Sequence, residues 1–258
     1  MTSTILEQVS ERAAEAALLR RLYRTMAAVR RLDREAVALR GRGVLPHYTG
    51  IRGREAVQVG ATAALDAARD AAFPADDELG VAVALGGDAA EALAPRRTGT
   101  GGSGLRGPVA HAAGWALGAK LDRTGGCALV GLGAGAGSAT EIREAVRTAR
   151  AAALPIVFLS TSGRGEGAGM PVLLVDGADV TAVHQATADA LEQVRAGIGP
   201  MLIDAVLPGR DAWPARDPLL LCERRLRESG TVDDAFFAQV ADTADALAEQ
   251  VRGRLATA

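Results

Sequence analysis

The stretch Cys127–Ser138, which reads CALVGLGAGAGS and is followed by EIREA at Glu141–Ala145, has the pattern of a buried strand, a glycine-rich turn and a helix start. A second apolar strand, PIVFLS at 155–160, runs into Thr-Ser-Gly at 161–163. This arrangement suits a diphosphate group, because a helix N-terminus offers unpaired N–H groups and glycines let the backbone approach closely. The stretch therefore predicts a βαβ unit whose glycine-rich turn could bind an anion such as a diphosphate.

The order of the neighbouring segments predicts the fold class. Over residues 127–206 the pattern runs strand, helix, strand, strand, helix, strand, with the last two strands at 172–175 and 201–206. That order predicts an α/β fold with a parallel sheet and helices on both faces. The segment 71–74 has the character of a short connection, and 94–107 that of a flexible loop. Further helices are expected at 12–40, 54–67, 79–85, 108–121, 179–196, 222–229 and 233–256.

Length and composition narrow the class of protein. The 258 residues suit a single domain, with an N-terminal helical region at about 12–67 and C-terminal helices at about 221–256. A net charge of −2 gives no reason to expect a nucleic-acid partner. An apolar run of about 18 residues and a signal peptide are both missing from the sequence, so we expect no membrane partner and a cytoplasmic location. Cys127 and Cys222 fit two reduced thiols.

Several segments together resemble the alpha subunit of the thiamine-diphosphate (ThDP)-dependent 2-oxo-acid dehydrogenases, the decarboxylating component for pyruvate or branched-chain 2-oxo acids. They occur in the family's order over roughly residues 15–220, which is hard to reach by chance. The matching segments are Leu22–Met26, Arg30–Asp33, Tyr48–Gly60, Phe73–Pro74, His111–Gly114, Ala119–Leu121, Glu144–Ala145, Leu154–Phe158, Val175–Val180 and Gly199–Ile203.

The resemblance implies a three-layer ThDP-binding fold and a heterotetramer of two alpha and two beta subunits, with ThDP at their interface. It also implies the place of the cofactor motif, which in the family reads Gly-Asp-Gly, then a helix and a strand ending in Asn-Asn. The positions carried over to this chain as cofactor-binding are Gly133, Ala134, Gly135, Ala136 and Ser162.

The departures from the family cluster at that motif. Ala134 stands at the aspartate position, and Ser162 and Gly163 stand at the two asparagine positions. A methyl group supplies no oxygen to magnesium, which demands near-octahedral oxygen ligands. Asp76 and Asp77 occupy the place of a Tyr-Arg pair that lies near the diphosphate in the family. Three loops are also shortened, at 85–108, 163–171 and 207–217.

These departures lead to a first interpretation and two alternatives. The first is a cofactor-site-degenerate alpha-type subunit, a structural or regulatory partner of a beta-type subunit, with no cofactor expected for the chain alone. The first alternative is a divergent active subunit of a ThDP-dependent decarboxylase or carboligase, with ThDP and magnesium bound and hydroxyls such as Ser162 near the metal. The second is a nucleotide or small-molecule binding protein. We assign no catalytic residue and no metal ligand.

Several other residues could bind a ligand or take part in catalysis, but each also has a purely structural explanation. Gly131-x-Gly133-x-x-Ala136 fits a dinucleotide fingerprint, but the next strand ends in Ser-Thr-Ser rather than in the acidic residue that binds a ribose. His111 opens a helix and is more often structural, and we expect His47 and His184 to be solvated. The acidic run 76–78 is typical of a helix's first turn. The arginines of the 94–107 loop could grip a phosphate, although a solvated loop is the simpler explanation.

Overall fold

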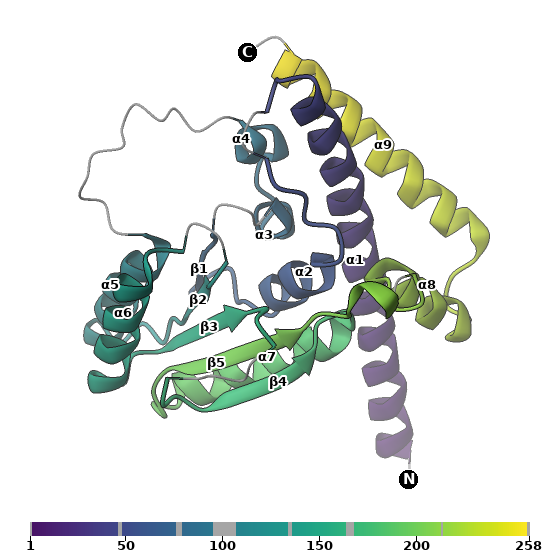
Figure 1. Cartoon of the computed structure of the whole chain (residues 1–258). Helices are drawn as coiled ribbons and strands as arrows, with labels where there is room; N and C mark the ends of the chain where they lie inside the picture. Colours follow the sequence, from purple (N-terminus) through teal and green to yellow (C-terminus); the bar gives the residue numbers. More distant parts are fainter. Residues whose placement is uncertain are drawn as a thin grey trace.

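The structure is a computed structural model that describes residues 2–45, 48–75, 79–94, 107–133, 136–163, 168–212 and 214–256. It contains one parallel sheet, helices on both of its faces, and a further layer of helices built from the two ends of the chain (Figure 1). The strands are β1 Ala71–Phe73, β2 Ala128–Gly131, β3 Ile156–Ser160, β4 Val172–Asp176 and β5 Met201–Val206. The helices are α1 Thr2–Gly41, α2 Glu55–Ala63, α3 Leu79–Ala84, α4 Ala89–Leu93, α5 Pro108–Leu121, α6 Ala139–Ala151, α7 Val180–Arg195, α8 Pro218–Glu228 and α9 Asp234–Ala256, with a 3-10 turn at Arg210–Ala212.

The sheet has the strand order β1-β2-β3-β5-β4, and every neighbouring pair is parallel. This confirms the predicted α/β fold with a parallel sheet. One strand was missed in the sequence, because 71–74 was expected to be a connection. The three residues of β1 have no pattern of their own, and they become a strand only because Ala71–Phe73 pair with Ala128–Val130 of β2.

Successive residues of the central strands face opposite layers of helices. Val130 and Phe158 lie in the core beneath α5 and α6, whereas Leu129 and Val157 lie in the core beneath α2 and α7. Strands buried on both faces read as continuous apolar runs, as β2 and β3 do. The three-layer arrangement therefore follows from the apolar runs together with the βαβ order.

The chain's two ends form the additional helical layer. The inner face of α1 contributes fully buried side chains at three- and four-residue steps, and α9 packs along it (Figure 1). Tyr23 meets Phe236 and Phe237 between the two helices, with ring centroids 6.0 and 5.3 Å from its own. α1 begins at Thr2, ten residues before the expected start. α8 also begins early, at Pro218, where Asp217 caps the helix.

A buried ionic cluster joins three helices of this layer. The Arg30 guanidinium donates to Glu55 at 2.5 Å and to both carboxylate oxygens of Asp217 at 2.9 and 3.0 Å. All three residues are at most 4% exposed. Glu55 also accepts the Gly53 N–H at 2.7 Å, so both of its oxygens are used. The cluster therefore links α1, the start of α2 and the start of α8.

The remaining expectations have mixed outcomes. Cys127 and Cys222 form no disulfide, as predicted, and both are buried. His111 is exposed. His184 lies on α7, as the sequence predicts for a helix residue, and is half-buried; burial lowers the pKa of this histidine. His47, the acidic run 76–78 and residues 95–106 lie outside the described residues. Within the described ranges, no helix combines the length and the apolar character needed to cross a bilayer.

Candidate cofactor site

The turn after β2 is held by backbone contacts. The Leu132 N–H donates to the Leu159 carbonyl of β3 at 2.8 Å, and the Ala136 N–H donates to the Gly133 carbonyl at 3.2 Å. The N-cap of α5 lies close against this turn, because a Cβ added at Gly107 would come within 2.5 Å of the Ala136 carbonyl oxygen. Ala134 and Gly135, at the tip of the turn, lie outside the described residues.

The amino end of α6 follows the turn and carries the predicted capping box. Ser138 Oγ accepts the Glu141 N–H at 3.2 Å, and a Glu141 carboxylate oxygen accepts the Ser138 N–H at 2.8 Å. Two backbone donors that an anion could otherwise use are therefore capped by the chain's own side chains. The Glu141 carboxylate also places negative charge where a diphosphate would bind.

The end of β3 is anchored to a buried carboxylate of the neighbouring strand. Asp204 of β5 is fully buried and lies opposite Ser160 in the sheet register. Its carboxylate accepts the Ser162 hydroxyl at 3.2 and 3.3 Å and the Gly163 N–H at 3.0 Å. Gly163 has a φ of +67°, a conformation that glycine adopts without strain. The contact fixes the course of the chain as it leaves the sheet.

Topology brings the sequence-predicted positions to one edge of the sheet. Gly131 of β2 lies opposite Leu159 of β3, so the residues that follow each strand emerge at the same carboxyl edge. Among the predicted site residues, Gly133 and Ala136 lie on the first turn and Ser162 on the second. In open α/β sheets, ligands bind in the crevice at this edge. The assignment of these residues to a cofactor remains a prediction.

Sequence reasoning missed Asp204. An aspartate inside the apolar run MLIDAV at 201–206 was a usable signal, because a buried carboxylate requires partners. Its partners could not be found from spacing, since they lie about forty positions earlier in the chain. The parallel pairing of β3 with β5 alone brings Ser162 and Gly163 to it.

The described part of the site does not supply a metal's ligands. Across the described residues, no group of three or more His, Cys, Asp or Glu side chains is arranged to hold a metal ion. Gly163 has no side-chain oxygen, and the Asp204 carboxylate is occupied by the serine hydroxyl and the glycine N–H. The described residues of the site thus present no ligand set for a divalent cation, and we derive no chemical step through one.

Fold and site together define an α/β protein with a parallel sheet, in which a glycine-containing turn leads from β2 to the capped start of α6. Residues 159–207 match the family described as "Dehydrogenase E1 component". The chain is 32% identical to the 3-methyl-2-oxobutanoate dehydrogenase subunit alpha of Mycobacterium tuberculosis, over 92% of this chain and 77% of that protein. It is 28% identical to the 2-oxoisovalerate dehydrogenase subunit alpha of Bacillus subtilis, over 89% and 88% of the two chains.

A similar solved structure is a transketolase mutant of Pichia stipitis in complex with xylulose 5-phosphate. It has a TM-score of 0.43 and 14% identity, and the match covers 92% of this chain and 49% of that one. We base no argument on that likeness. The sequence relatives are sufficient: the chain belongs to the family of alpha subunits of the ThDP-dependent 2-oxo-acid dehydrogenases, the E1 components.

Family membership corrects the expectation that the chain alone has no cofactor. The relatives are ThDP-dependent E1 subunits, which bind ThDP and a divalent metal ion. The expectation of no cofactor rested on the substitutions at Ala134 and Gly163, which bear on the metal. The similarity to these cofactor-dependent subunits overturns it.

Proposed function

We propose that this chain is the alpha-type subunit of a ThDP-dependent 2-oxo-acid dehydrogenase-like complex and serves there as a structural or regulatory partner of a beta-type subunit. The complex would be a heterotetramer of two alpha and two beta chains in the cytoplasm. The observation that carries the proposal is the anchoring of Ser162 and Gly163 to Asp204, in a site whose described residues offer no metal ligand set.

One surface supports a partner subunit. α5 is composed mostly of apolar residues, with polar side chains only at His111 and Lys120, and its Leu117 and Leu121 are 42% and 73% exposed. A helix of that character is normally buried on all sides. A Cβ added at Gly114 or Gly118 would meet no described atom within 4 Å, so packing inside this chain does not explain these glycines. Close approach of a partner would explain them.

The second candidate is the active subunit, and one observation favours it. The backbone at Gly163 still accommodates an asparagine, because an added Cβ would meet only a Val206 methyl group at 3.8 Å. Asparagine also tolerates the left-handed conformation better than most residues. The scaffold at this position therefore remains compatible with the family's side chain.

The test is reconstitution with a beta-type subunit of the same family, in the presence of ThDP and magnesium. Light scattering reports assembly, and carbon dioxide release from branched-chain 2-oxo acids reports activity. We expect a stable heteromer with turnover far below about 10 s⁻¹, the median for enzymes. The M. tuberculosis relative in the same assay is the positive control. Turnover near that of the control would reject the structural role in favour of the active subunit.

A double variant distinguishes two causes of low activity: the substituted side chains at 134 and 163, and the shortened loops around the site. Ala134→Asp with Gly163→Asn restores both oxygen-bearing side chains of the family's motif. We expect the variant heteromer to assemble and remain as slow as the parent, because the loops at 85–108, 163–171 and 207–217 are also shortened. A large gain in turnover over the parent would instead show that the two side chains alone limit the reaction.

A further inference from the structure

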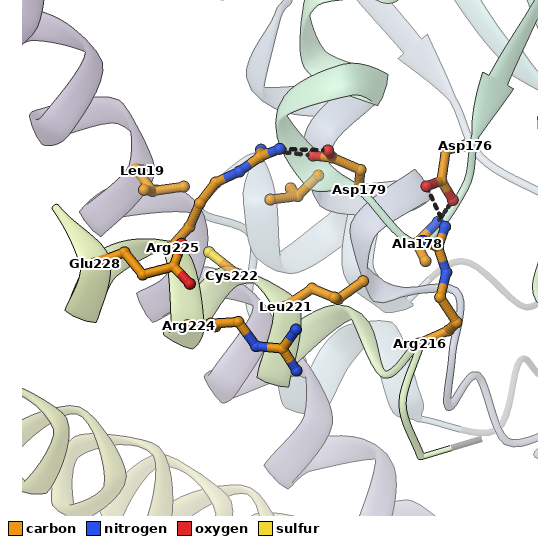
Figure 2. A pocket seen from close by; sticks show the side chains of 11 residues that line it. Leu19, Asp176, Ala178, Asp179, Arg216, Leu221, Cys222, Arg224, Arg225 and Glu228 are labelled. Carbon is orange, nitrogen blue, oxygen red and sulfur yellow. Dashed lines mark hydrogen bonds and ion pairs between the residues drawn. The ribbon is translucent and has the colours of Figure 1, made fainter. Parts of the chain in front are cut away.

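A cavity of about 210 Å³ lies away from the candidate cofactor site, at the far edge of the sheet (Figure 2). It is bounded by α1, by the turn from β4 into α7, and by α8. In the strand order, β5 separates β4 from β3, so this cavity is distinct from the crevice at the ends of β2 and β3. Nothing in the proposed function uses it.

One part of the cavity wall is apolar. Leu19 of α1 and Leu221 of α8 line it together with Ala178, Val180 and the buried thiol of Cys222. Figure 2 shows Leu221 in the middle of the wall and Leu19 at one end. Burial raises the pKa of Cys222 to about 12, so this sulfur contributes a neutral, weakly polar surface. An apolar body of a few carbon atoms matches this part of the wall in character.

The polar part of the wall is formed by arginine–aspartate pairs. Arg225 donates to both oxygens of Asp179 at 2.9 and 2.8 Å, and Arg216 donates to Asp176 (Figure 2). Asp179 additionally accepts the N–H groups of Thr181 and Ala182 and the Thr181 hydroxyl. The acceptor capacity of Asp179 is thus largely used.

The guanidinium groups, in contrast, keep donors to spare. A guanidinium has five N–H donors, and among the described residues Arg216 uses one of its own, toward Asp176. Arg224, which also lines the cavity, has no hydrogen-bond partner in the described part of the chain. The aspartate holds the Arg216 plane in place, which limits the entropy that a further hydrogen bond would cost. The unused hydrogen-bonding capacity on this side of the cavity is therefore that of a donor.

The ionisable side chains of the lining carry equal numbers of positive and negative charges. Arg216, Arg224 and Arg225 are balanced by Asp176, Asp179 and Glu228, so the lining has no surplus positive charge to favour a dianion over a monoanion. In Figure 2, Glu228 lies toward the Leu19 end, away from Arg216. We propose that the cavity binds a small monocarboxylate with an apolar body, its carboxylate accepting from Arg216 and its body lying against Leu221.

The experiment compares three probes on the full chain by calorimetry. They are 4-methylpentanoate, the uncharged 4-methylpentan-1-ol with the same body, and inorganic phosphate. We expect saturable binding of the carboxylate with a dissociation constant on the order of 1 mM or below, as its few atoms permit. The alcohol and phosphate should each bind at least about tenfold more weakly, since each lacks one of the two recognised features. Equal binding of the alcohol, or tighter binding of phosphate, would overturn the proposal.

Three variants locate the site. Arg216→Gln should weaken binding of 4-methylpentanoate about tenfold by removing a charged donor, and Leu221→Trp should abolish it by filling the cavity. Arg227→Gln is the matched control, because it removes an arginine of α8, the helix that carries Leu221, which pairs with Glu223 and Asp234 and does not line the cavity. Thermal unfolding confirms that each variant is folded. Unchanged binding in folded Arg216→Gln, or loss in Arg227→Gln alone, would place the ligand elsewhere.

Discussion

At the scale of single residues, Asp204 defines the edge of the candidate cofactor site. A fully buried carboxylate is costly unless it is hydrogen-bonded, and Ser162 and Gly163 supply donors here. The same contacts give the chain after β3 its direction. A residue that chemistry alone would mark as a metal ligand is thereby committed to holding the loop.

Replacing Asp204 with alanine should therefore destabilise the fold. Asp204→Ala removes the charged acceptor of the Ser162 hydroxyl and of the Gly163 N–H, and we expect a loss of about 2–3 kcal/mol in the free energy of unfolding, because both hydrogen bonds are made to a charged group. Ser162→Ala, which removes only one donor, should cost about 1 kcal/mol. Urea denaturation of both variants measures the difference. Equal losses in the two variants would show that the carboxylate does not anchor the loop.

At the scale of elements, the Arg30 cluster joins the helical layer. Arg30 lies on α1, Glu55 at the start of α2, and Asp217 at the N-cap of α8. Two of the segments that resemble the E1 family, 30–33 and 48–60, contribute residues to this cluster. Part of the family resemblance is thus explained by helix packing rather than by cofactor binding.

The cluster makes stability depend on pH in the acid range. Burial by itself raises the pKa of Asp217, but hydrogen bonds and attraction from Arg30 outweigh it, and the net pKa is lowered. A carboxylate whose pKa is lower in the folded state stabilises the fold above its unfolded pKa of about 3.9. This contribution is lost as pH falls from there through the lower, folded pKa.

Asp217→Asn should reveal this dependence. The variant should be less stable than the parent at pH 7 by about 3 kcal/mol, because Arg30 loses one of its two buried partners. The gap should narrow as pH falls below about 4. Asp234→Asn is the control, since Asp234 pairs with Arg227 on the surface, where an ion pair contributes about 0–1 kcal/mol. Urea denaturation between pH 3 and 7 tests this, and a gap that stays constant with pH would contradict the assignment.

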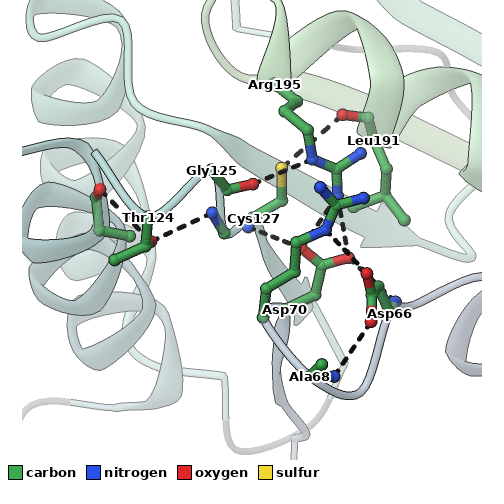
Figure 3. A network of polar contacts seen from close by, with 11 residues as sticks. Asp66, Ala68, Asp70, Thr124, Gly125, Cys127, Leu191 and Arg195 are labelled. Carbon is green, nitrogen blue, oxygen red and sulfur yellow. Dashed lines mark hydrogen bonds and ion pairs between the residues drawn. The ribbon is translucent and has the colours of Figure 1, made fainter. Parts of the chain in front are cut away.

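At the scale of the whole molecule, the surface of α5 is the main feature that the single chain leaves unexplained. α5 lies in the layer that covers one face of the sheet (Figure 1), and it carries exposed leucines and glycines with open space around them. At the amino edge of β2 the chain supplies its own partners: Arg195 of α7 donates to Asp70 and to the Gly125 carbonyl, while Asp70 accepts the Cys127 N–H (Figure 3). Those contacts provide hydrogen-bond partners for the polar groups at the amino edge of β2, whereas the exposed leucines of α5 form the surface that we expect a partner subunit to cover.

A charge placed on α5 should therefore disrupt assembly. Leu117→Glu puts a carboxylate into the proposed contact with the beta-type subunit, and we expect its affinity to fall at least about a hundredfold through desolvation of the charge. Val37→Glu on α1, where the parent side chain is similarly exposed, is the matched control. Light scattering of the mixed subunits tests both variants. Intact assembly with Leu117→Glu, in a chain that remains folded, would exclude α5 as the interface.

The sequence by itself determined the class of the fold, because apolar runs, glycine turns and the Ser138–Glu141 capping box are local signals with local physical causes. It also pointed to the E1 family and to the turn at Gly133. That the chain forms a single domain stays a prediction. The sequence could not give β1, whose three residues are a strand only beside β2, nor the partners of Asp204.

Only the tertiary structure decided the contacts between distant segments. Arg30 meets Asp217 across 187 positions, and Ser162 meets Asp204 across 42. No local propensity encodes these separations; they arise when apolar faces pack and buried charges must find partners. The cavity beside Leu221 has the same origin, since α1, α7 and α8 come together only after the sheet and its helical layer are assembled.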